Sequence, residues 1–542
     1  MSDNNGHVHR IWHVPESVRH ILSYSKAKDL VSLACTAQVF RLPALAQVWN
    51  EVDDDGILAL LQIVTDSDKV MQVRWSHFED YARLVDRLAL RSFTKRTRDK
   101  LNRVVAMRPR QDRPILPQLT SLHSHPTDPR DLLCILYFMH KDLVEFHLDL
   151  PMTSEQFDTL SGNDWQEPLE AVLFRVETEL PHLKRLKLIL PSTDLGLISK
   201  GFFSKFAELD TFIGNEEALA DDGLLELARL QSLRKLAIAA SVGSSTEPSV
   251  VDLRSTPGAP CFPILEDLEL AQNIDVTLGI LDTMKGPLRR FNCSVAQPMS
   301  FEEAHRLVKA IASFHQTLRR LDLSMEVVPV DSAAGKWQDL AELLDCHKLV
   351  YLGLVYHVSG RLFEFTDADL LSIASNLPEL HELWVCWTPR PELKTDDEEV
   401  GGGLLDESAI TLWGLARLLQ QYPKLDRIHL TSINTADIHN SASAIEKVSR
   451  KIEISAQSMI ISSPSNVAMF LEGWLPNCHL KLLEPGDDAD WNVQASDNNQ
   501  QLVLIMSLVE LLRCHRHLVD TPMAFKDLDI PDCAKSIWTL LP

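Results

Sequence analysis

The chain has 542 residues, of which 45% are hydrophobic and 24% are charged, a composition typical of folded globular proteins rather than disordered ones. Its 76 acidic residues outnumber its 53 basic residues and give a formal net charge of −23. A surface this negative repels phosphate backbones and anionic lipids, so the charge argues against nucleic acid or a membrane as the partner.

Residues 1–53 are predicted to form a small module of three helices. The first begins at Pro15, where the missing N–H of proline costs nothing. The second follows Asp29 as a cap, and the third begins at Pro43. Three short helices make a core too small to be stable alone, so we expect the module to present apolar surface to a partner. The apolar positions at helical spacing include Val14, Val18, Leu22, Leu30, Leu33 and Trp49.

Residues 54–115 are predicted to form a basic helical linker. Between Arg87 and Arg113 stand ten basic residues and only two aspartates, inside a chain that is acidic overall. One interpretation is a docking patch for an acidic partner or a phosphate group. The other, which we favour, is the solvated face of linker helices.

Residues 116–485 contain a repeated Leu-x-x-Leu-x-Leu pattern, in which isoleucine, valine, phenylalanine or cysteine replaces some leucines. Between 183 and 380 the copies, counting a weaker one at Leu209, recur every 23 to 32 residues, a spacing that suits one strand and one helix per repeat. The first leucines of the clear copies are Leu183, Leu233, Leu265, Leu288, Leu318, Leu349, Leu380 and Leu425.

The segments between these motifs are predicted to be helical. Ser300 precedes Glu303 by three residues, the signature of a capping box, and Leu307 and Ile311 continue an apolar face. The leucines of each strand can be buried only if the next repeat stacks on them. We therefore expect an α/β solenoid with a parallel sheet and outer helices, closed by a helical cap over residues 486–542.

Side chains alternate in direction along a strand, so the residues between the leucines should line the face of the sheet opposite the helices. Large aromatic residues and arginines in such positions are the residue types that dominate the energy of protein interfaces. The predicted target-binding residues are Arg290, Arg320, Asp322, Tyr351, Glu382, Trp384, Arg427 and His429. The alternative for Trp384 is packing beneath a neighbouring loop.

Two family resemblances follow from these residues. The repeats resemble the leucine-rich-repeat family over residues 116–485. The order Val-Pro-Glu, Ile-Leu, Asp-Leu, Phe, Pro-Ala-Leu and Trp in residues 14–49 resembles an F-box, in particular those of fungal F-box proteins. This second resemblance implies docking on the Skp-type adaptor of a cullin ubiquitin ligase. By resemblance, the adaptor-binding residues are Val14, Pro15, Val18, Leu22, Leu30, Leu33 and Trp49.

No motif for catalysis or for cofactor binding is present. The chain lacks H-E-x-x-H, G-x-x-x-x-G-K, G-x-S-x-G and G-x-G-x-x-G patterns. His123-x-His125 and the segment from Cys514 to His517 lack further ligands at the spacing of a zinc site. We therefore expect no catalytic residues, no metal and no cofactor.

Nine cysteines without a C-x-x-C pair indicate free thiols in a reducing compartment. The first residues carry no signal pattern, and no apolar stretch is long enough to span a bilayer. We expect an intracellular protein, either cytoplasmic or nuclear.

The sequence thus predicts a non-catalytic substrate-recognition subunit of a Skp–cullin–F-box ubiquitin ligase, with an unknown protein as its substrate. The alternative is a repeat scaffold unrelated to ubiquitin, whose first helices only cap the solenoid. The ligase function requires Val14, Val18, Leu22 and Trp49 to be partly exposed. The scaffold function requires them to be buried against the first repeats.

Overall fold

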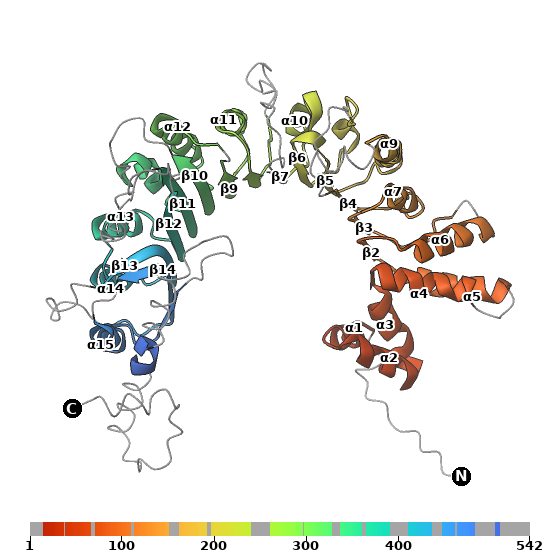
Figure 1. Ribbon diagram of the computed structural model, residues 1–542, viewed down its shortest axis with the longest axis horizontal. Helices are drawn as coiled ribbons and strands as arrows, with labels where there is room; N and C mark the ends of the chain where they lie inside the picture. Colours follow the sequence, from red (N-terminus) through yellow and green to blue (C-terminus); the bar gives the residue numbers. More distant parts are fainter. Residues whose placement is uncertain are drawn as a thin grey trace, which may run out of the picture. The chain divides into compact units, whose positions relative to one another are not determined.

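The computed structural model describes residues 15–36, 38–66, 71–109, 113–150, 162–191, 197–239, 261–295, 297–327, 337–359, 365–390, 410–435, 447–460, 463–482 and 504–509. The helices and strands of the chain are labelled in Figure 1. The chain divides into two compact units, which are described separately below. The first unit comprises residues 1–265 and 283–286, and the second comprises 266–282 and 287–542.

The first unit begins with three short helices, as the apolar stripes predict: α1 (Pro15–Leu22), α2 (Ala27–Thr36) and α3 (Gln38–Trp49). Two predicted starts are wrong: Asp29 lies in the first turn of α2 rather than at its cap, and Pro43 lies inside α3. Both α1 and α2 pack against α3. Val18, Leu22, Leu30 and Ala44 are buried together and form the core of this module. The three helices therefore hold one another in place through a core of their own.

The rest of the first unit alternates strands with helices. Its seven described strands are parallel and follow one another in chain order. The elements are β1 (Glu51–Val52), α4 (Asp54–Thr65), α5 (Met71–Ala82), β2 (Arg87–Leu90), α6 (Lys95–Met107), β3 (Ser121–Ser124), α7 (Pro129–Ile135), β4 (Glu145–Asp149), α9 (Gly162–Glu179), β5 (Arg185–Ile189), η2 (Phe203–Lys205), β6 (Thr211–Asn215), η3 (Glu216–Ala218), α10 (Ala220–Ala228) and β7 (Lys235–Ala239).

The second unit continues the same alternation with eight described strands in chain order. Its elements are β8 (Asp267–Leu270), α11 (Ile274–Thr283), β9 (Arg290–Ser294), α12 (Phe301–Ala312), β10 (Arg320–Val327), η5 (Trp337–Asp345), β11 (Tyr351–Ser359), α13 (Asp367–Asn376), β12 (Glu382–Arg390), α14 (Leu412–Gln421), β13 (Arg427–Asn434), β14 (Ile452–Ile460), α15 (Pro464–Trp474) and β15 (Cys478–Leu482).

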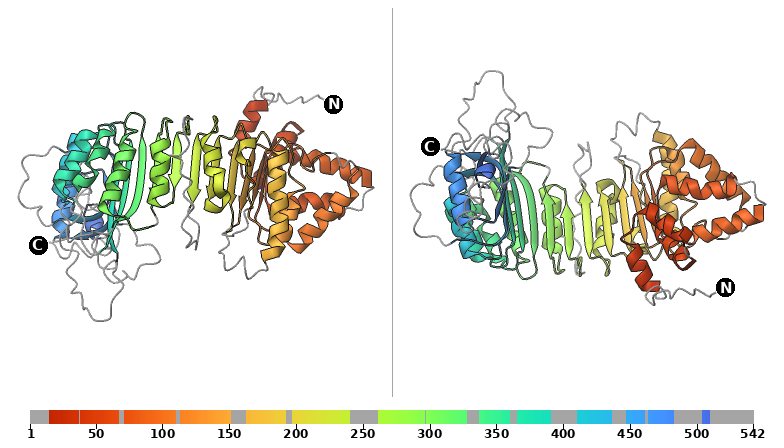
Figure 2. Two further views of the ribbon diagram at one scale, coloured as in Figure 1. Left: turned by 90° about the horizontal axis from the view of Figure 1, so that it is seen from above. Right: turned by 90° about the horizontal axis from the view of Figure 1, so that it is seen from below.

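The leucine motifs form continuous buried rows. Leu321 pairs in register with Phe291 on one side and Leu352 on the other, and Leu352 pairs with Leu383. All four side chains are almost completely buried. In each unit the helices lie on the face of the sheet that carries these rows and leave the other face open (Figure 2). The predicted fold class is confirmed: the protein is an α/β leucine-rich-repeat solenoid.

Two helices of the second unit begin at capping boxes. The Ser300 hydroxyl accepts a hydrogen bond from the Glu303 amide at 3.3 Å, and the Ser300 amide donates to the Glu303 carboxylate at 2.7 Å. Thr366 and Asp369 make the same reciprocal pair at the start of α13. Each box satisfies two amides that the helix itself leaves unpaired, and it confirms the helix start predicted at Ser300.

The region predicted as a helical linker, residues 54–115, contains helices but also a strand of the sheet. Strand β2 pairs with β1 and β3, so the repeated unit of strand and helix begins before residue 116. The motif is present there as Val85-x-x-Leu88-x-Leu90, with valine in place of the first leucine, and all three side chains are buried. Within the predicted cap, the structure describes residues 504–509, which are helical with Ile505 and Val509 buried; the rest of 486–542 lies outside the described residues.

Several side chains of the basic segment pair with carboxylates of neighbouring elements. Arg98 lies 2.8 Å from carboxylate oxygens of both Asp128 and Asp131. Lys100 pairs with Asp66. Arg98 and Lys100 are largely buried in these pairs and join consecutive repeats, so for these two side chains the prediction of a solvated face is wrong.

Replacing Leu321 by alanine should destabilise the second unit, because Leu321 lies at the centre of the buried row. Leucine-to-alanine changes in cores cost about 2–5 kcal/mol. Urea unfolding, with hydrogen exchange of the β9–β11 amides, measures this loss. Lys309→Ala on the exposed side of α12 is the control and should change stability by about 0.5 kcal/mol or less. Equal effects of the two changes would contradict this account of the core.

Candidate functional site

The N-terminal module buries three of the predicted adaptor-binding residues. Val18, Leu22 and Leu30 lie in the module core, with Leu33 partly buried against it. The prediction that Val18, Leu22 and Leu30 contact the adaptor is therefore not met in this structure. The exposure of Val18 and Leu22 that the ligase function was expected to require is absent, but both are buried in the core of the module rather than against the first repeats. Their apolar helix faces form the core of the module, because an amphipathic helix buries its apolar face against its neighbours.

Other apolar side chains of the module are exposed. The exposed fraction is 78% for Tyr24 and 70% for Leu42, and the Tyr24 ring has an edge contact with His20. We call the following five residues the module surface: Ile21, Tyr24, Val31, Val39 and Leu42. Sequence reasoning did not assign this set to the interface. Ile21 and Val31 lie next to the predicted contact residues Leu22 and Leu30, whereas the other three lie next to none of them.

The remaining predicted adaptor residues divide into three cases. Trp49 is half-buried, and its ring packs on Tyr81 of α5 with centroids 5.4 Å apart. Trp49 thus joins the module to the first repeats. Pro15 opens α1 as predicted. Val14 lies outside the described residues.

The predicted target-binding residues occupy two adjacent rows across the second unit. Strand register places Arg290, Arg320, Tyr351, Glu382 and Arg427 side by side in the first row. The second row, two residues further along each strand, contains Asp322, Gly353, Trp384 and His429. The structure therefore brings together all eight residues that the sequence assigned to this face.

Tyr351 is buried and tied to its neighbours. Its exposed fraction is 8%, and its hydroxyl donates a hydrogen bond to Asp322 at 3.2 Å. The Arg320 guanidinium carbon lies 3.8 Å from the centroid of the ring, a cation–π contact. Burial and the nearby Asp322 carboxylate raise the pKa of Tyr351 above its ordinary value. Tyr351 therefore supports Arg320 rather than serving as an exposed anchor, which corrects the prediction.

Trp384 and His429 form a second cluster. Their rings are stacked with centroids 4.4 Å apart, and Trp384 is half-buried. The Trp384 indole N–H donates to Cys386 Sγ at 2.9 Å. His429 is buried, and its Nε2 lies 3.9 Å from a Glu382 oxygen. Burial lowers the pKa of His429 although Glu382 acts against it, so the ring is neutral near pH 7 and offers its π face to Trp384.

The exposed members of the rows are arginines. Arg290, Arg320 and Arg427 are exposed on the open face, and Arg427 lies 3.3 Å from a Glu382 oxygen. Arginine carries five donors on a planar group and is suited to carboxylates of a partner. The arrangement offers three exposed guanidinium groups, of which that of Arg320 lies over the Tyr351 ring.

Gly353 is a residue that sequence reasoning missed. A Cβ at this position would lie 2.8 Å from Asp322 Oδ1 and 2.9 Å from the Tyr351 hydroxyl. Only glycine leaves room for the Tyr351–Asp322 hydrogen bond at this point of the row. The signal in the sequence is a glycine in the middle of a strand motif, which often marks a close approach of a neighbouring group.

Comparisons with known proteins yield structural neighbours only. No family model matches the chain, and no curated protein matches it in sequence. A chain from the crystal structure of the Rad7 and Elc1 complex in yeast is 14% identical, with a TM-score of 0.34, over 72% of this chain and 90% of that one. A chain from the crystal structure of the TLR13–ssRNA13 complex is 12% identical, with a TM-score of 0.27, over 74% of this chain and 52% of that one. The assignment to the leucine-rich-repeat class rests on the sheet and its leucine rows.

Among the described residues, no helix combines the length and the apolar character needed to cross a membrane.

Gly353→Ala should break the Tyr351–Asp322 hydrogen bond and destabilise the second unit by about 1–3 kcal/mol, the usual cost of overpacking. It should also lower the pKa of Tyr351, because burial and the Asp322 contact are what raise it. Ultraviolet titration of tyrosine against a Tyr351→Phe variant measures this shift. Gly279→Ala on α11, where an added Cβ meets nothing within 4 Å, is the control. An unchanged titration in Gly353→Ala would refute the proposed clash.

His429 should make the second unit sensitive to acid. Its pKa is lowered in the folded state, so below about pH 6.5, the ordinary value, the unfolded chain takes up a proton that folded His429 does not. Stability therefore falls as the pH falls. His429→Phe keeps an aromatic ring beside Trp384 and should reduce this loss, measured by urea midpoints between pH 7.5 and 5. Parallel curves for the two proteins would rule out this role.

Proposed function

We propose that this chain is a substrate-recognition subunit of a Skp–cullin–F-box type ubiquitin ligase. The N-terminal module would bind the Skp-type adaptor, through which the cullin core is reached. The open face of the repeats would bind the target protein. The chain itself would contribute no catalytic group, but would hold its target close to the catalytic subunits in a suitable orientation.

The observation that carries this proposal is the exposed apolar surface of a module with its own core. A helical cap would direct its apolar side chains against the first repeat. Here α1 and α2 pack on α3 instead, while Tyr24 and Leu42 are mostly exposed. Exposed large apolar side chains gathered on one small module are typical of a binding surface.

The resemblance to an F-box gives this surface a partner. The residues that carry the resemblance are largely the module core, so they specify the three-helix arrangement. The contacts with the adaptor would then come from the module surface and from Trp49, which stays half-buried at the boundary with α5.

The target would bind on the open face of the second unit. Arg290, Arg320 and Arg427 are exposed there, and Trp384 is half-buried and stacked on His429. Arginine and tryptophan are the residue types most often found at the energetic centres of interfaces. Exposed guanidinium groups within a chain of net charge −23 favour an acidic segment of the target at this point.

The proposal is tested by mixing the purified full-length chain with a purified Skp-type adaptor and measuring complex formation by gel filtration and calorimetry. We expect a complex of one chain with one adaptor. The double variant Tyr24→Asp/Leu42→Asp should weaken binding at least tenfold, because both changes place charge in an apolar contact while leaving the module core intact. Leu22→Asp is unsuitable as the test, since it would unfold the module.

Phe174→Asp is the matched control, because Phe174 is an equally exposed apolar residue (67%) on α9 of the same unit. It should bind the adaptor like the wild type. If the folded wild-type chain forms no complex at micromolar concentrations, the ligase function is wrong and the protein is a leucine-rich-repeat scaffold unrelated to ubiquitin.

A further inference from the structure

Four polar side chains form a compact group on the open face of the first unit. His123 and Ser121 lie on β3, and His147 and Glu145 lie on β4. The strand register pairs His123 with His147 and Ser121 with Glu145. Since residues two apart on a strand share a face, all four side chains lie on the side opposite the buried leucine row.

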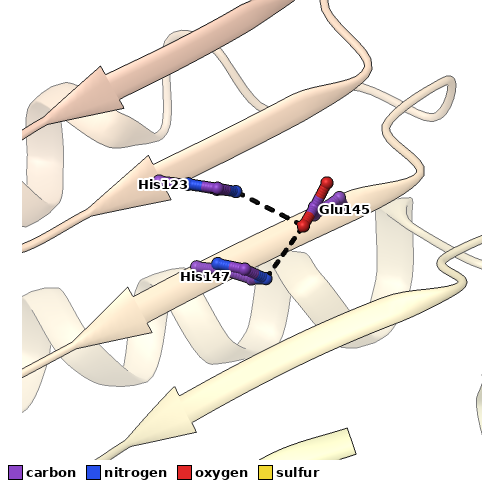
Figure 3. Close-up of side chains that lie close together, drawn as sticks. All are labelled: His123, Glu145 and His147. Atoms are coloured by element: carbon purple, nitrogen blue, oxygen red, sulfur yellow. Dashed lines mark ion pairs between the residues drawn. The ribbon is translucent and has the colours of Figure 1, made fainter. Parts of the chain in front are cut away.

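The two imidazoles turn their Nε2 atoms toward one carboxylate oxygen (Figure 3). Glu145 Oε1 lies 3.4 Å from His123 Nε2 and 3.1 Å from His147 Nε2. The rings are stacked with centroids 4.0 Å apart and nearly parallel planes. The ligand atoms of all three residues lie within 4.8 Å of one another.

We propose that His123, Glu145 and His147 bind a divalent metal ion of the zinc class on the open face of the first unit. Two imidazoles and one carboxylate are a ligand set that Zn²⁺ accepts, with the fourth position open. In tetrahedral coordination, ligand atoms about 2.0–2.1 Å from the ion lie ~3.3 Å apart. The observed separations require only small side-chain movements to reach that geometry.

The surroundings suit such a site. The side chains of Glu145, His147 and His123 are 13%, 21% and 36% exposed, so the group is shielded yet can be reached from solvent.

Neighbouring charges leave the ligand atoms available. Arg185 lies 3.3 Å from the other oxygen of Glu145, Oε2, so it orients the carboxylate without occupying Oε1. Lys187 is engaged by Asp149 at 2.6 Å, and His125 lies 3.6 Å from the same aspartate. The Ser121 hydroxyl lies 3.0 Å from His123 Nε2, so the ion would have to displace this contact to bind that nitrogen. An ion here would face the open side of the sheet, where a bound partner has access to the free position.

The test is zinc binding by the metal-free full-length chain, measured by competition with a chromophoric chelator in a buffer that does not bind metals. We expect one equivalent of Zn²⁺ bound by nitrogen and oxygen ligands. X-ray absorption at the zinc edge separates these ligands, at about 2.0–2.1 Å, from cysteine sulfur at about 2.3 Å. This readout excludes binding by the nine cysteines.

His123→Gln, His147→Gln and Glu145→Gln should each lower the affinity of this equivalent at least tenfold. His182→Gln is the matched control, because His182 also faces a carboxylate, Glu208 at 3.0 Å, in the first unit but has no second histidine beside it. It should bind zinc like the wild type. Far-ultraviolet circular dichroism verifies that each variant is folded. The proposal is overturned if the wild type binds no zinc, if the bound zinc has only sulfur ligands, or if the three variants bind as tightly as the control.

Discussion

Parallel strand register is the constraint on which the rest of this structure depends. A leucine on one strand lies between the apolar residues of the strands before and after it, as Leu321 lies between Phe291 and Leu352, and the helices cover the same face. Each repeat is thus stabilised by its nearest neighbours and by little else, which is the general property of solenoids. The register that aligns the leucines also fixes which side chains meet on the open face.

The clusters on that face are direct consequences of this register. Arg320 and Tyr351 meet because both stand one residue before a motif leucine on adjacent strands. Trp384 and His429 meet in the same way, because each stands one residue after the buried motif position of its strand, Leu383 or Ile428. His123 and His147 occupy the corresponding position of β3 and β4. A single alternation of side chains therefore produces a buried apolar layer on one face and rows of interacting polar and aromatic groups on the other.

The sequence was sufficient to predict the fold and the composition of the open face, because a leucine motif carries its own register. The eight target-face residues were identified from this motif alone. What it could not predict is how far each side chain is buried there. Tyr351 is buried because Gly353 leaves room for its hydrogen bond to Asp322. That bond joins two strands, and its two residues are 29 positions apart in the sequence.

The histidine cluster shows a different kind of omission. His123 was compared with His125, its neighbour in sequence, and no further ligand was found at the spacing of a zinc site. In a solenoid the neighbours of a side chain lie one repeat away, so the relevant alignment sets Leu122 against Phe146 and brings His123 beside His147. The pairing of the two histidines could therefore be predicted only by aligning each repeat with the next one.

The N-terminal module shows the limit of reading an interface from apolar periodicity. Apolar residues at helical spacing predict a buried stripe, and a module of three short helices uses its best stripes, which contain Val18, Leu22 and Leu30, to form its core. The apolar residues that stay exposed and could contact a partner lie outside these stripes. Tyr24 and Leu42 are examples, and they follow no regular helical spacing. In a module this small, the motif that identifies the fold and the surface that binds the partner are therefore made by different residues.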